Sequence, residues 1–306
     1  MANVLDRAIA RMLPAVPKPI VRKVSQRYIA GSALEDACRV VAELNEAGKM
    51  ATIDVLGEEH EDPDETRAVV GDYDAVFDAI EQRKLDSNVS VKLTALGLKL
   101  SYELCRENLQ AVVAHAARSG NFVRIDMEDS SGTEDTLRIY RELREDGHDN
   151  VGVVLQSRLR RTLRDIRALA DLRPNVRLCK GIYLEPPLVA YQDFQEVRDN
   201  FVAALKLLLV KGCYVGIATH DEWLLERGEA LVAGLGPREY EFQMLLGVRP
   251  LRGDKLVRVG HRLRIYVPFG EHWYRYSLRR LQENPKIAGY IASDTLGRLF
   301  GSNGRP

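Results

Sequence analysis

The chain has 306 residues, of which 45% are hydrophobic, so it is long enough to bury a sizeable core within one large α/β domain. Lys plus Arg and Asp plus Glu both number 44, so no overall positive charge favours nucleic acid or an anionic membrane surface. The four cysteines lack the spacing of a zinc site and no stretch is as long and apolar as a membrane span, so a cytoplasmic protein is the simplest interpretation.

Short apolar runs alternate along the chain with longer charged segments of helical periodicity. The first 48 residues contain a proline-rich stretch at 14–19 and a capped helical pattern at 32–47, so we predict extra N-terminal helices packed against the remaining fold. Beyond residue 49 we predict eight strands. They cover residues 51–56, 89–93, 122–127, 151–156, 176–180, 214–219, 240–245 and 264–269.

The segments between these strands carry apolar residues at three- and four-residue spacing, which is typical of helices that cover a sheet. The clearest of them span residues 63–84, 101–118, 134–145, 159–171 and 188–210. Eight βα units within residues 49–284 match a (β/α)8 barrel of the TIM type, and we expect the whole chain to be a single α/β domain that ends in a helix or tail at 285–306. A doubly wound open sheet is the alternative, but it would have fewer strands, and no GxGxxG follows the first one.

Polar side chains are concentrated where the predicted strands end, which is where a βα barrel carries its active site. Strand alternation puts Lys92 on the same face as Ser90, and Asp126 on the same face as Arg124. Because their strands are neighbours, Lys92 and Asp126 can pair across the mouth of the barrel. Spacing alone leaves open whether this pair is catalytic or a structural ion pair in the lumen.

The segment YRYSLRR follows the last predicted strand after a short loop. On a helix, Tyr276, Arg279 and Arg280 would share one face. Two neighbouring guanidinium groups repel each other unless both are solvated or an anion lies between them, and a carboxylate or phosphate suits their fork geometry. A lone RR pair, however, more often marks an exposed basic helix end.

Taken together, these segments resemble the proline dehydrogenase family in its short monofunctional bacterial form. The similarity runs over residues 50–285, and its motifs occur in the order of the family: SVKLTALGL, RIDMED, VRLCKGIY, ATHD, YEFQMLLG, RIYVPFG and YRYSLRRLQENP. Each motif lies at a predicted strand end or, for the last, on the helix that follows strand eight. The ordered set is far more specific than any single motif.

The resemblance implies oxidation of L-proline to 1-pyrroline-5-carboxylate, the first step of proline catabolism to glutamate, with non-covalently bound FAD. Hydride would pass from proline C5 to flavin N5, and a quinone would accept the electrons. The substrate-binding positions of the family correspond to Lys92, Asp126, Tyr183, Leu245, Tyr266, Tyr276, Arg279 and Arg280. The cofactor-binding positions correspond to Gln156, Arg177, Lys180, Thr219 and His220.

Within these sets, the resemblance implies that Arg279 and Arg280 clamp the substrate carboxylate. Lys92 and Asp126 would form an ion pair beside the proline ring. Arg177 would lie near flavin N5, where a cation stabilises negative charge on the reduced ring, and it joins Lys92 and Asp126 as a catalytic residue. Positioning would supply most of the catalysis.

Two positions depart from the pattern of the family, and one spacing departs from regular strand geometry. Ile182 stands where the family often has alanine, so its branched side chain would tighten the pocket or repack. Arg158 stands where an aromatic residue is usual after the glutamine of strand four, so the flavin environment there would differ. Arg177 and Lys180 lie three residues apart and cannot both face inward on a regular strand, so the strand must end or bend between them.

We predict no metal site, because the histidines and Asp221 have no ligand spacing. The segment RLRRTLRDIR holds Arg158, Arg160, Arg161, Arg164 and Arg167. Leucine and isoleucine recur between them at helical spacing, so we interpret it as a solvated outer helix and expect no nucleic-acid partner.

Two other functions remain open from the residues alone. A barrel lyase or aldolase would use Lys92 or Lys180 to form a Schiff base. A non-catalytic protein would bind small carboxylates through Arg279 and Arg280. The resemblance itself leaves proline and hydroxyproline undistinguished. It implies a membrane quinone as the acceptor, and thus a cytoplasmic protein that contacts the inner face of the cytoplasmic membrane peripherally; residues 1–16 and 287–300 are mildly amphipathic candidates for that contact.

Overall fold

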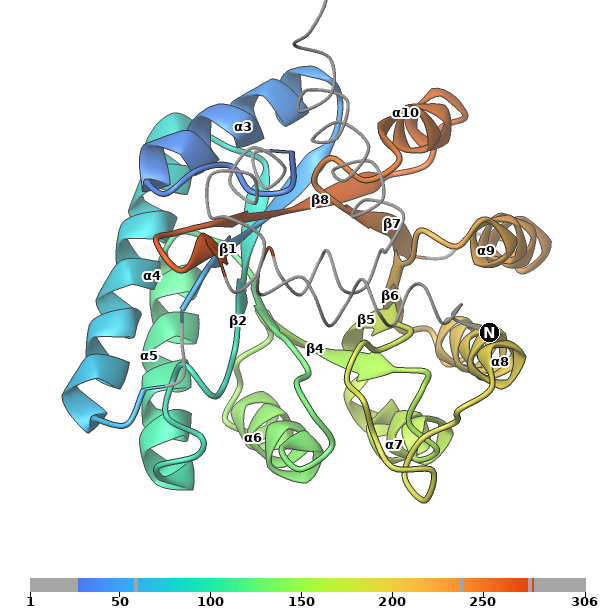
Figure 1. Ribbon diagram of the computed structural model, residues 1–306, viewed down its shortest axis with the longest axis horizontal. Coiled ribbons are helices and arrows are strands. Elements are labelled where there is room, and N and C mark those ends of the chain that lie inside the picture. The colour runs from blue at the N-terminus through green and yellow to red at the C-terminus, as the bar shows by residue number, and fades with distance from the viewer. Residues whose placement is uncertain (1–26, 58–59, 237–238, 275–276, 278–306) are drawn as a thin grey trace, which may run out of the picture.

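The computed structural model describes residues 27–57, 60–236, 239–274 and 277, and within them parallel strands close into a barrel in chain order (Figure 1). β1 pairs with β8, which completes the closed sheet and confirms the predicted TIM-type barrel. All eight predicted strands are present, with bounds within a few residues of those expected. They are β1 (Met50–Val55), β2 (Ser87–Val91), β3 (Val123–Ile125), β4 (Val151–Gln156), β5 (Asn175–Cys179), β6 (Tyr214–Ala218), β7 (Tyr240–Leu245) and β8 (Leu263–Phe269).

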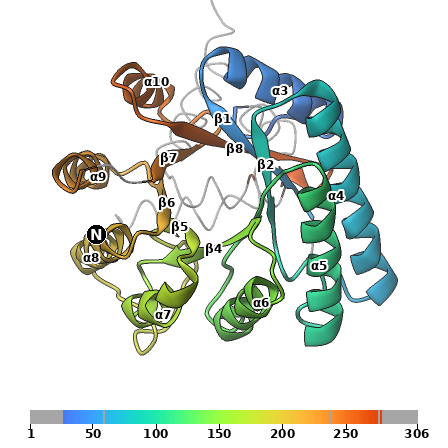
Figure 2. The ribbon, with the colours of Figure 1, turned by 180° about the vertical axis from the view of Figure 1, so that it is seen from behind.

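Helices cover the outside of the barrel, and Figures 1 and 2 show them around the strands from opposite sides. The described helices are α3 (Leu34–Glu46), α4 (Pro63–Arg83), α5 (Tyr102–Arg118), α6 (Thr133–Glu145), α7 (Thr162–Ala168), α8 (Phe194–Val210), α9 (Glu222–Gly234) and α10 (Pro250–Arg258), with a 3-10 turn η2 (Ala170–Leu172) after α7. α3 is the described part of the predicted N-terminal helices. The segments 1–26 and 285–306 lie outside the described residues.

Two predicted helices begin later than their periodicity indicates. The helix predicted over 159–171 begins at Thr162 as α7, because the preceding residues pair with a distant loop: Leu159 forms an antiparallel bridge with Ala190. The helix predicted over 188–210 begins at Phe194 as α8, because the Asp193 carboxylate caps it by accepting backbone hydrogen bonds at 2.8 and 3.1 Å. Arg158, Arg160 and Arg161 of the basic segment therefore precede the helix.

The strands separate an apolar outer face from a polar lumen. Ile53 and Val91 belong to the apolar core, whereas Thr52, Asp54 and Ser90, which alternate with them, are fully buried polar residues. Two inward glycines make room for long polar side chains: a Cβ at Gly152 would collide with Arg124 Nη1, and one at Gly216 with the Gln243 amide. A lumen of this kind can carry charges along the barrel axis, where branched apolar side chains are usual.

No helix within the described part of the chain is long and apolar enough to cross a membrane.

Candidate active site

Lys92 lies just beyond β2, and its ammonium contacts two carboxylates. Nζ is 2.7 and 2.8 Å from the oxygens of Asp54 on β1, and 3.9 Å from Oδ2 of Asp126, which follows β3. Asp54 is completely buried, and Lys92 exposes 21% of its side chain. The two predicted partners, Lys92 and Asp126, are therefore within ion-pair distance, but the shorter contacts of Lys92 are made to Asp54.

Asp126 is held mainly by Arg177, which reaches it across the mouth from β5. Arg177 Nη1 donates to Asp126 Oδ1 at 2.7 Å and to Ser90 Oγ at 2.9 Å. Arg177 Nε donates to Gln243 Oε1 on β7 at 2.6 Å. The residue as a whole is only 7% exposed and its guanidinium is held from two directions, so the plane of the guanidinium is set by the barrel before any ligand arrives.

Tyr266, on β8, connects these groups. Its hydroxyl donates to Asp126 Oδ2 at 3.1 Å and accepts from Lys92 Nζ at 3.4 Å, while its ring lies 5.3 Å from Arg177 Cζ. Four residues predicted for the site, from four different strands or strand ends, thus meet in one cluster. Charges alternate through it in the order Asp54, Lys92, Asp126 and Arg177, which sum to zero.

The surrounding charges keep Lys92 in its ammonium form. Burial lowers the pKa of Lys92, but the carboxylates of Asp54 and Asp126 outweigh burial, so the pKa lies well above its ordinary value. Burial also raises the pKa of the Asp54 carboxyl, against the opposing charge of Lys92. An ammonium bound on two sides acts as a fixed donor and a positive charge, and it is a poor amine nucleophile.

A hydrogen-bonded column continues from Arg177 down the lumen. Gln243 accepts from Arg177 and donates through Nε2 to Glu241 Oε1 at 2.6 Å. Glu241 in turn accepts from Arg264 Nε at 2.7 Å and from the Tyr214 hydroxyl at 2.6 Å. Burial alone would raise the pKa of Glu241, but Arg264 and these hydrogen bonds outweigh it, so the pKa lies below its usual value. The orientation of Arg177 therefore depends on residues at the far end of the barrel.

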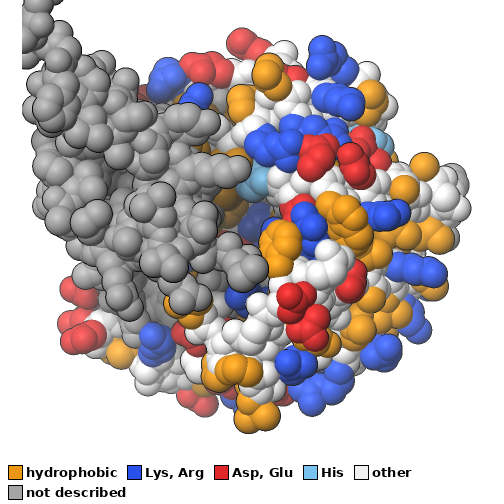
Figure 3. Space-filling model, turned by 45° about the vertical axis from the view of Figure 1, so that its right-hand side comes forward, with side chains coloured by type: hydrophobic (Ala, Val, Ile, Leu, Met, Phe, Trp, Pro, Cys, Tyr) orange, Lys and Arg blue, Asp and Glu red, His pale blue; other side chains and the backbone are white. Residues whose placement is uncertain are grey.

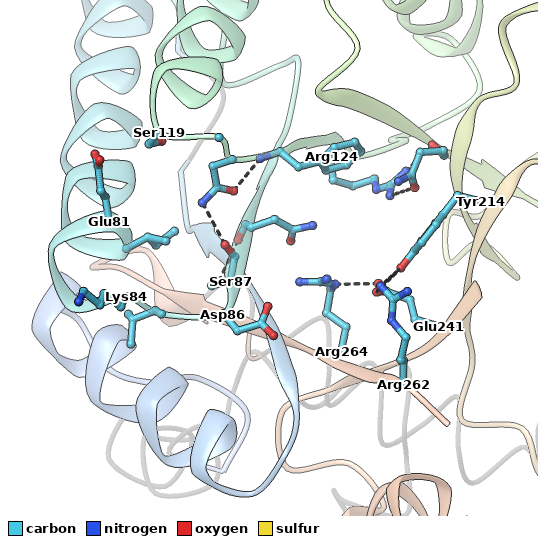
Figure 4. A pocket seen from close by; sticks show the side chains of 17 residues that line it. Glu81, Lys84, Asp86, Ser87, Ser119, Arg124, Tyr214, Glu241, Arg262 and Arg264 are labelled. Atoms are coloured by element: carbon cyan, nitrogen blue, oxygen red, sulfur yellow. Dashed lines mark hydrogen bonds and ion pairs between the residues drawn. The ribbon is translucent and has the colours of Figure 1, made fainter. Parts of the chain in front are cut away.

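At that amino end lies a cavity of about 550 Å³. Figure 4 shows Arg264, Arg262 and Tyr214 converging on Glu241 at one side of it, with Arg124 on another. None of the predicted site residues that the structure describes lines this cavity. Because the amino ends of barrel strands serve stability rather than chemistry, we place the candidate site at the opposite end, around Lys92 and Arg177.

Lys180 belongs to a second cluster at the carboxyl ends of the strands, the same face as Lys92 and Arg177. β5 ends at Cys179, between Arg177 and Lys180, as the strand geometry requires. Lys180 Nζ lies 3.2 Å from Asp221 Oδ2, and Asp221 also accepts two hydrogen bonds from Arg198 at 2.9 and 2.6 Å. Burial raises the pKa of Asp221, but these cations outweigh burial and hold the pKa below its usual value. Asp221, to which the sequence assigned no role because it lacks metal-ligand spacing, is the anchor of this cluster.

Thr219 and His220 follow β6 and face the same region. Thr219 Oγ1 accepts from the backbone of Asp221 at 3.2 Å. His220 Nε2 accepts from the backbone N–H of Leu245 at 2.9 Å, which assigns the neutral ring with its proton on Nδ1. Leu245, a predicted wall of the substrate pocket, is the half-buried last residue of β7.

Gln156, the last residue of β4, is also fixed before any ligand binds. Its Nε2 donates to Met127 O and Glu128 O, both at 2.9 Å. A Cβ at Gly181 would come within 2.8 Å of Gln156 Oε1, so only glycine lets the chain pass this close.

Nearby, the buried Nε of Arg158 has no hydrogen-bond partner among the described residues. The backbone N–H of Arg158 donates to Lys180 O. An orphaned buried donor beside a lysine fits the phosphates and carbonyls of a bound dinucleotide.

The other predicted substrate residues are Tyr183 and three residues of the segment after β8. Tyr183 is half-buried in the connection between β5 and α8. Tyr276, Arg279 and Arg280 lie outside the described residues, so the carboxylate clamp stays a prediction. Within the described ranges, no group of three or more His, Cys, Asp or Glu side chains is arranged to hold a metal ion.

Asp54, Ser90 and Gln243 contact the cluster but are not among the residues predicted for it. The signal for Asp54 is a single acid in the apolar run ATIDVL, in register with Ser90 on the neighbouring strand. Asp54 lies inside β1 rather than after it, whereas the active site of a βα barrel is expected just beyond the strand ends. Its depth in the lumen is what gives it the shortest contact with Lys92.

Comparison with known proteins gives one consistent family. The sequence model described as proline dehydrogenase matches residues 37–292. Proline dehydrogenase 1 of Bacillus subtilis subsp. natto is 39% identical over 274 residues, covering 89% of this chain and 90% of the relative, and proline dehydrogenase of Deinococcus radiodurans is 36% identical over 279 residues with the same coverage. The crystal structure of proline utilization A (PutA) from Bdellovibrio bacteriovorus, inactivated by N-propargylglycine, superposes with a TM-score of 0.82 at 23% identity. That alignment covers 99% of this chain and 38% of the larger one, and supports the barrel fold.

Proposed function

Because the chain belongs to the proline dehydrogenase family, we propose that it oxidises L-proline to 1-pyrroline-5-carboxylate with FAD as its cofactor. The observation that carries this proposal is the cluster of Lys92, Asp126, Arg177 and Tyr266 at the carboxyl ends of the strands. It offers a fixed ammonium, a carboxylate and an aromatic ring to a small zwitterion that has an apolar ring.

Substrate binding would combine this cluster with the predicted clamp. Arg279 and Arg280 would hold the carboxylate of proline. Its ring would lie beside the pair of Lys92 and Asp126. The remaining walls would come from Tyr183, Leu245, Tyr266 and Tyr276. Two guanidinium groups at the carboxylate of proline and aromatic side chains against its ring would fix both the position and the orientation of the substrate.

The cofactor would be held by Gln156, Arg177, Lys180, Thr219 and His220. When bound, FAD supplies at N5 the acceptor for the hydride that leaves proline C5. Arg177 contributes a positive charge that Gln243 and Ser90 already orient, so little reorganisation is needed as negative charge develops nearby. Lys92, held as an ammonium, lies 3.9 Å from the carboxylate of Asp126 and offsets its negative charge beside the substrate.

The lyase alternative is disfavoured by the same contacts. Schiff-base formation requires a neutral amine, and Lys92 is bound by Asp54 through two short contacts that favour its charged form. Lys180 is engaged by Asp221 at 3.2 Å.

The test is a visible spectrum of the purified protein under anaerobic conditions. We expect flavin absorbance that bleaches when L-proline is added and stays unchanged with pyrrolidine, which lacks the carboxylate. Flavin that proline leaves oxidised would contradict the proposal. A colourless protein whose lysine is trapped by borohydride with substrate would support the lyase, and a colourless unreactive protein would support a binder.

A matched pair of arginine variants sharpens this test. Arg177→Gln should slow proline-dependent bleaching by roughly a hundredfold, because a preoriented charge at the reacting centre is lost. Arg173→Gln changes an exposed arginine just before the same strand and should leave the rate unchanged. Equal rates of bleaching in both variants would show that the charge of Arg177 does not contribute to flavin reduction.

We further propose that electrons pass to a membrane quinone, which would bring a cytoplasmic protein to the inner face of the cytoplasmic membrane. After anaerobic reduction with proline, a soluble quinone should restore the flavin absorbance faster than dissolved oxygen does. Faster reoxidation by oxygen would make the protein an oxidase and would count against the quinone.

A further inference from the structure

Acids accompany the cations on the surface of this protein. Figure 3 shows a face on which orange hydrophobic side chains lie among blue Lys and Arg and red Asp and Glu side chains. Arg124, on β3, differs from these surface cations. It is only 2% exposed, and within the described ranges it forms no ion pair with a carboxylate. A buried charge without a countercharge is costly, so the surroundings of Arg124 should show what compensates it.

The guanidinium of Arg124 is held in place but not neutralised. Its Nη1 donates to Val153 O at 3.1 Å and to Asn175 O at 2.6 Å, and its Nη2 donates to Asn175 Oδ1. These acceptors are uncharged, and the buried Nε has no hydrogen-bond partner among the described residues. Burial and the positive charge of Arg177 both lower the pKa of Arg124 from its ordinary value. An anion nearby would counter both effects.

Arg124 lines the cavity of about 550 Å³ at the amino end of the barrel, where Figure 4 shows it together with Arg264, Arg262 and Glu241. Among the described residues, the charged side chains of this lining are Lys84, Arg124, Arg262 and Arg264 against Glu81, Asp86 and Glu241. Four cations thus face three carboxylates, which leaves one positive charge in excess. Glu241 is not available to Arg124, because it already accepts from Arg264 Nε at 2.7 Å and from the Tyr214 hydroxyl at 2.6 Å.

The uncharged part of the lining offers hydrogen-bond donors and apolar surface. Asn88 Oδ1 accepts from Thr52 Oγ1 at 2.5 Å and Asn175 Oδ1 accepts from Arg124, so within the described residues the NH2 groups of both amides remain for a ligand. Apolar side chains border the same space: Ile80, Leu85 and Phe122. Spare donors and one excess positive charge suit a carboxylate, and the apolar side chains suit a hydrocarbon body attached to it.

We infer that this cavity binds a small organic acid with a single carboxylate and an apolar body, and that the bound carboxylate supplies the countercharge of Arg124. A dianion such as phosphate fits less well, because its second charge would meet Glu241 and Asp86. The cavity is separate from the cluster of Lys92 and Arg177 at the carboxyl ends of the strands. The inference therefore goes beyond the proposed function and does not depend on it.

Phenylacetate is a suitable probe, and phenylacetamide is its uncharged counterpart. Isothermal titration of the full chain should detect binding of phenylacetate. The melting temperature should rise with its concentration, because a ligand that binds only the folded chain stabilises it. Phenylacetamide should bind roughly tenfold more weakly, because it lacks the charge that Arg124 attracts. Absence of phenylacetate binding, or equal affinity for the two compounds, would overturn the inference.

Asn175→Asp tests the part played by Arg124. The new carboxylate would occupy the position of the Asn175 amide, next to Arg124 Nη2, and would supply the missing countercharge from within the chain. We expect this variant to melt at a higher temperature than the unaltered chain when no ligand is present. Its affinity for phenylacetate should fall roughly tenfold. Unchanged affinity in this variant would contradict the inference.

A matched pair of arginines at the amino face gives a second test that leaves the buried lumen unaltered. Arg262 lines the cavity with a side chain that is 55% exposed, so Arg262→Gln should weaken phenylacetate binding roughly threefold, the effect of an exposed charge. Arg258→Gln changes an exposed arginine at the end of α10 that does not line the cavity, and it should leave the affinity unchanged. Equal affinities in the two variants would count against the cavity as the binding site.

A last variant separates this cavity from the predicted substrate clamp. Arg279→Gln with Arg280→Gln removes the clamp and should leave the affinity for phenylacetate unchanged. Loss of phenylacetate binding in this variant, or complete displacement of phenylacetate by L-proline, would place the probe in the substrate pocket and overturn the inference. Failure of proline to bleach the flavin would instead refute the proposed function, with no effect on the titration with phenylacetate.

Discussion

At the scale of single residues, Asp54 is the carboxylate on which the charge of Lys92 depends. It is completely buried and makes the two shortest contacts that Lys92 forms. Removing one partner of a buried pair leaves the other charge without compensation, which costs more than the pair itself contributes. Asp54 is thus a positioning residue, since it acts through Lys92.

Asp54→Asn should lower the free energy of unfolding by about 3–5 kcal/mol, because the buried ammonium of Lys92 loses its nearest countercharge. Denaturant unfolding measures the loss. The control is Asp254→Asn, which breaks a lysine–aspartate contact of similar length, 2.6 Å to Lys49, with an aspartate that is 44% exposed. That change should cost no more than about 1 kcal/mol. Similar losses of unfolding free energy at the two sites would show that burial of the pair does not increase the cost of breaking it.

Glu241 should make stability depend on pH in the acid range. Its folded pKa lies below the unfolded value of about 4.3, so its contribution is fully present above that pH and is lost as pH falls through the folded pKa. Glu241→Gln removes this titration, and its plot of unfolding free energy against pH should be shallower below about pH 4.3. Urea unfolding across the range measures the slope. As a control for the loss of an acid, Glu43→Gln, in an exposed pair with Arg39, should change the free energy of unfolding at neutral pH by no more than about 1 kcal/mol.

At the scale of elements, capping side chains determine where α4, α5 and α8 begin. Pro63 is the first residue of α4, and the Asp62 carboxylate just before it accepts from Asp64 N at 2.8 Å. Ser101 caps α5, because its hydroxyl accepts from Leu104 N at 3.3 Å. Such signals are readable from sequence, and so is the alternation of the strands. The late start of α7 is not, because it results from pairing of Leu159 with Ala190 across about thirty residues.

The end of α4 stores a small backbone strain. Lys84 caps this helix with φ of 53°, in the left-handed region that favours glycine. Lys84→Gly should therefore raise the free energy of unfolding by up to about 1 kcal/mol. Lys211, which caps α8, has φ of −76°, so Lys211→Gly relieves nothing and should lower stability. Thermal unfolding compares the two. A loss of stability in both variants would contradict the strain argument.

At the scale of the whole molecule, the site draws on strands from both ends of the chain. Asp54 is on β1, Arg177 on β5 and Tyr266 on β8, so the cluster exists only when β1 pairs with β8. If FAD binds as proposed, its release in urea should coincide with the loss of helical circular dichroism. Flavin fluorescence and far-UV ellipticity, followed in the same titration, measure both. Release well before the loss of helices would mean that the site can open within an intact barrel.

The sequence was sufficient to predict the closed barrel, because eight alternating segments leave few other arrangements. It also predicted that Lys92 and Asp126 lie close together, whereas Arg177 and Tyr266 were assigned to the site only through the resemblance to the family. It could not predict that Lys92 prefers Asp54 to Asp126, because that preference depends on the register of β1 against β2 and on depth in the lumen. The hydrogen-bonded column from Arg177 through Gln243 to Glu241 could not be predicted either, because its contacts form only once the facing strands are in place.

The column from Arg177 to Arg264 has a practical consequence for protein engineering. Exchanging a buried ion pair for packed leucines is a common way to make an enzyme more heat-resistant. Here the pair of Glu241 and Arg264 ends a chain of contacts that orients the guanidinium at the reactive end. A thermostabilised variant built by that exchange would therefore hold the Arg177 guanidinium less firmly and turn over more slowly. Screens for heat resistance should measure the turnover rate as well as the melting temperature.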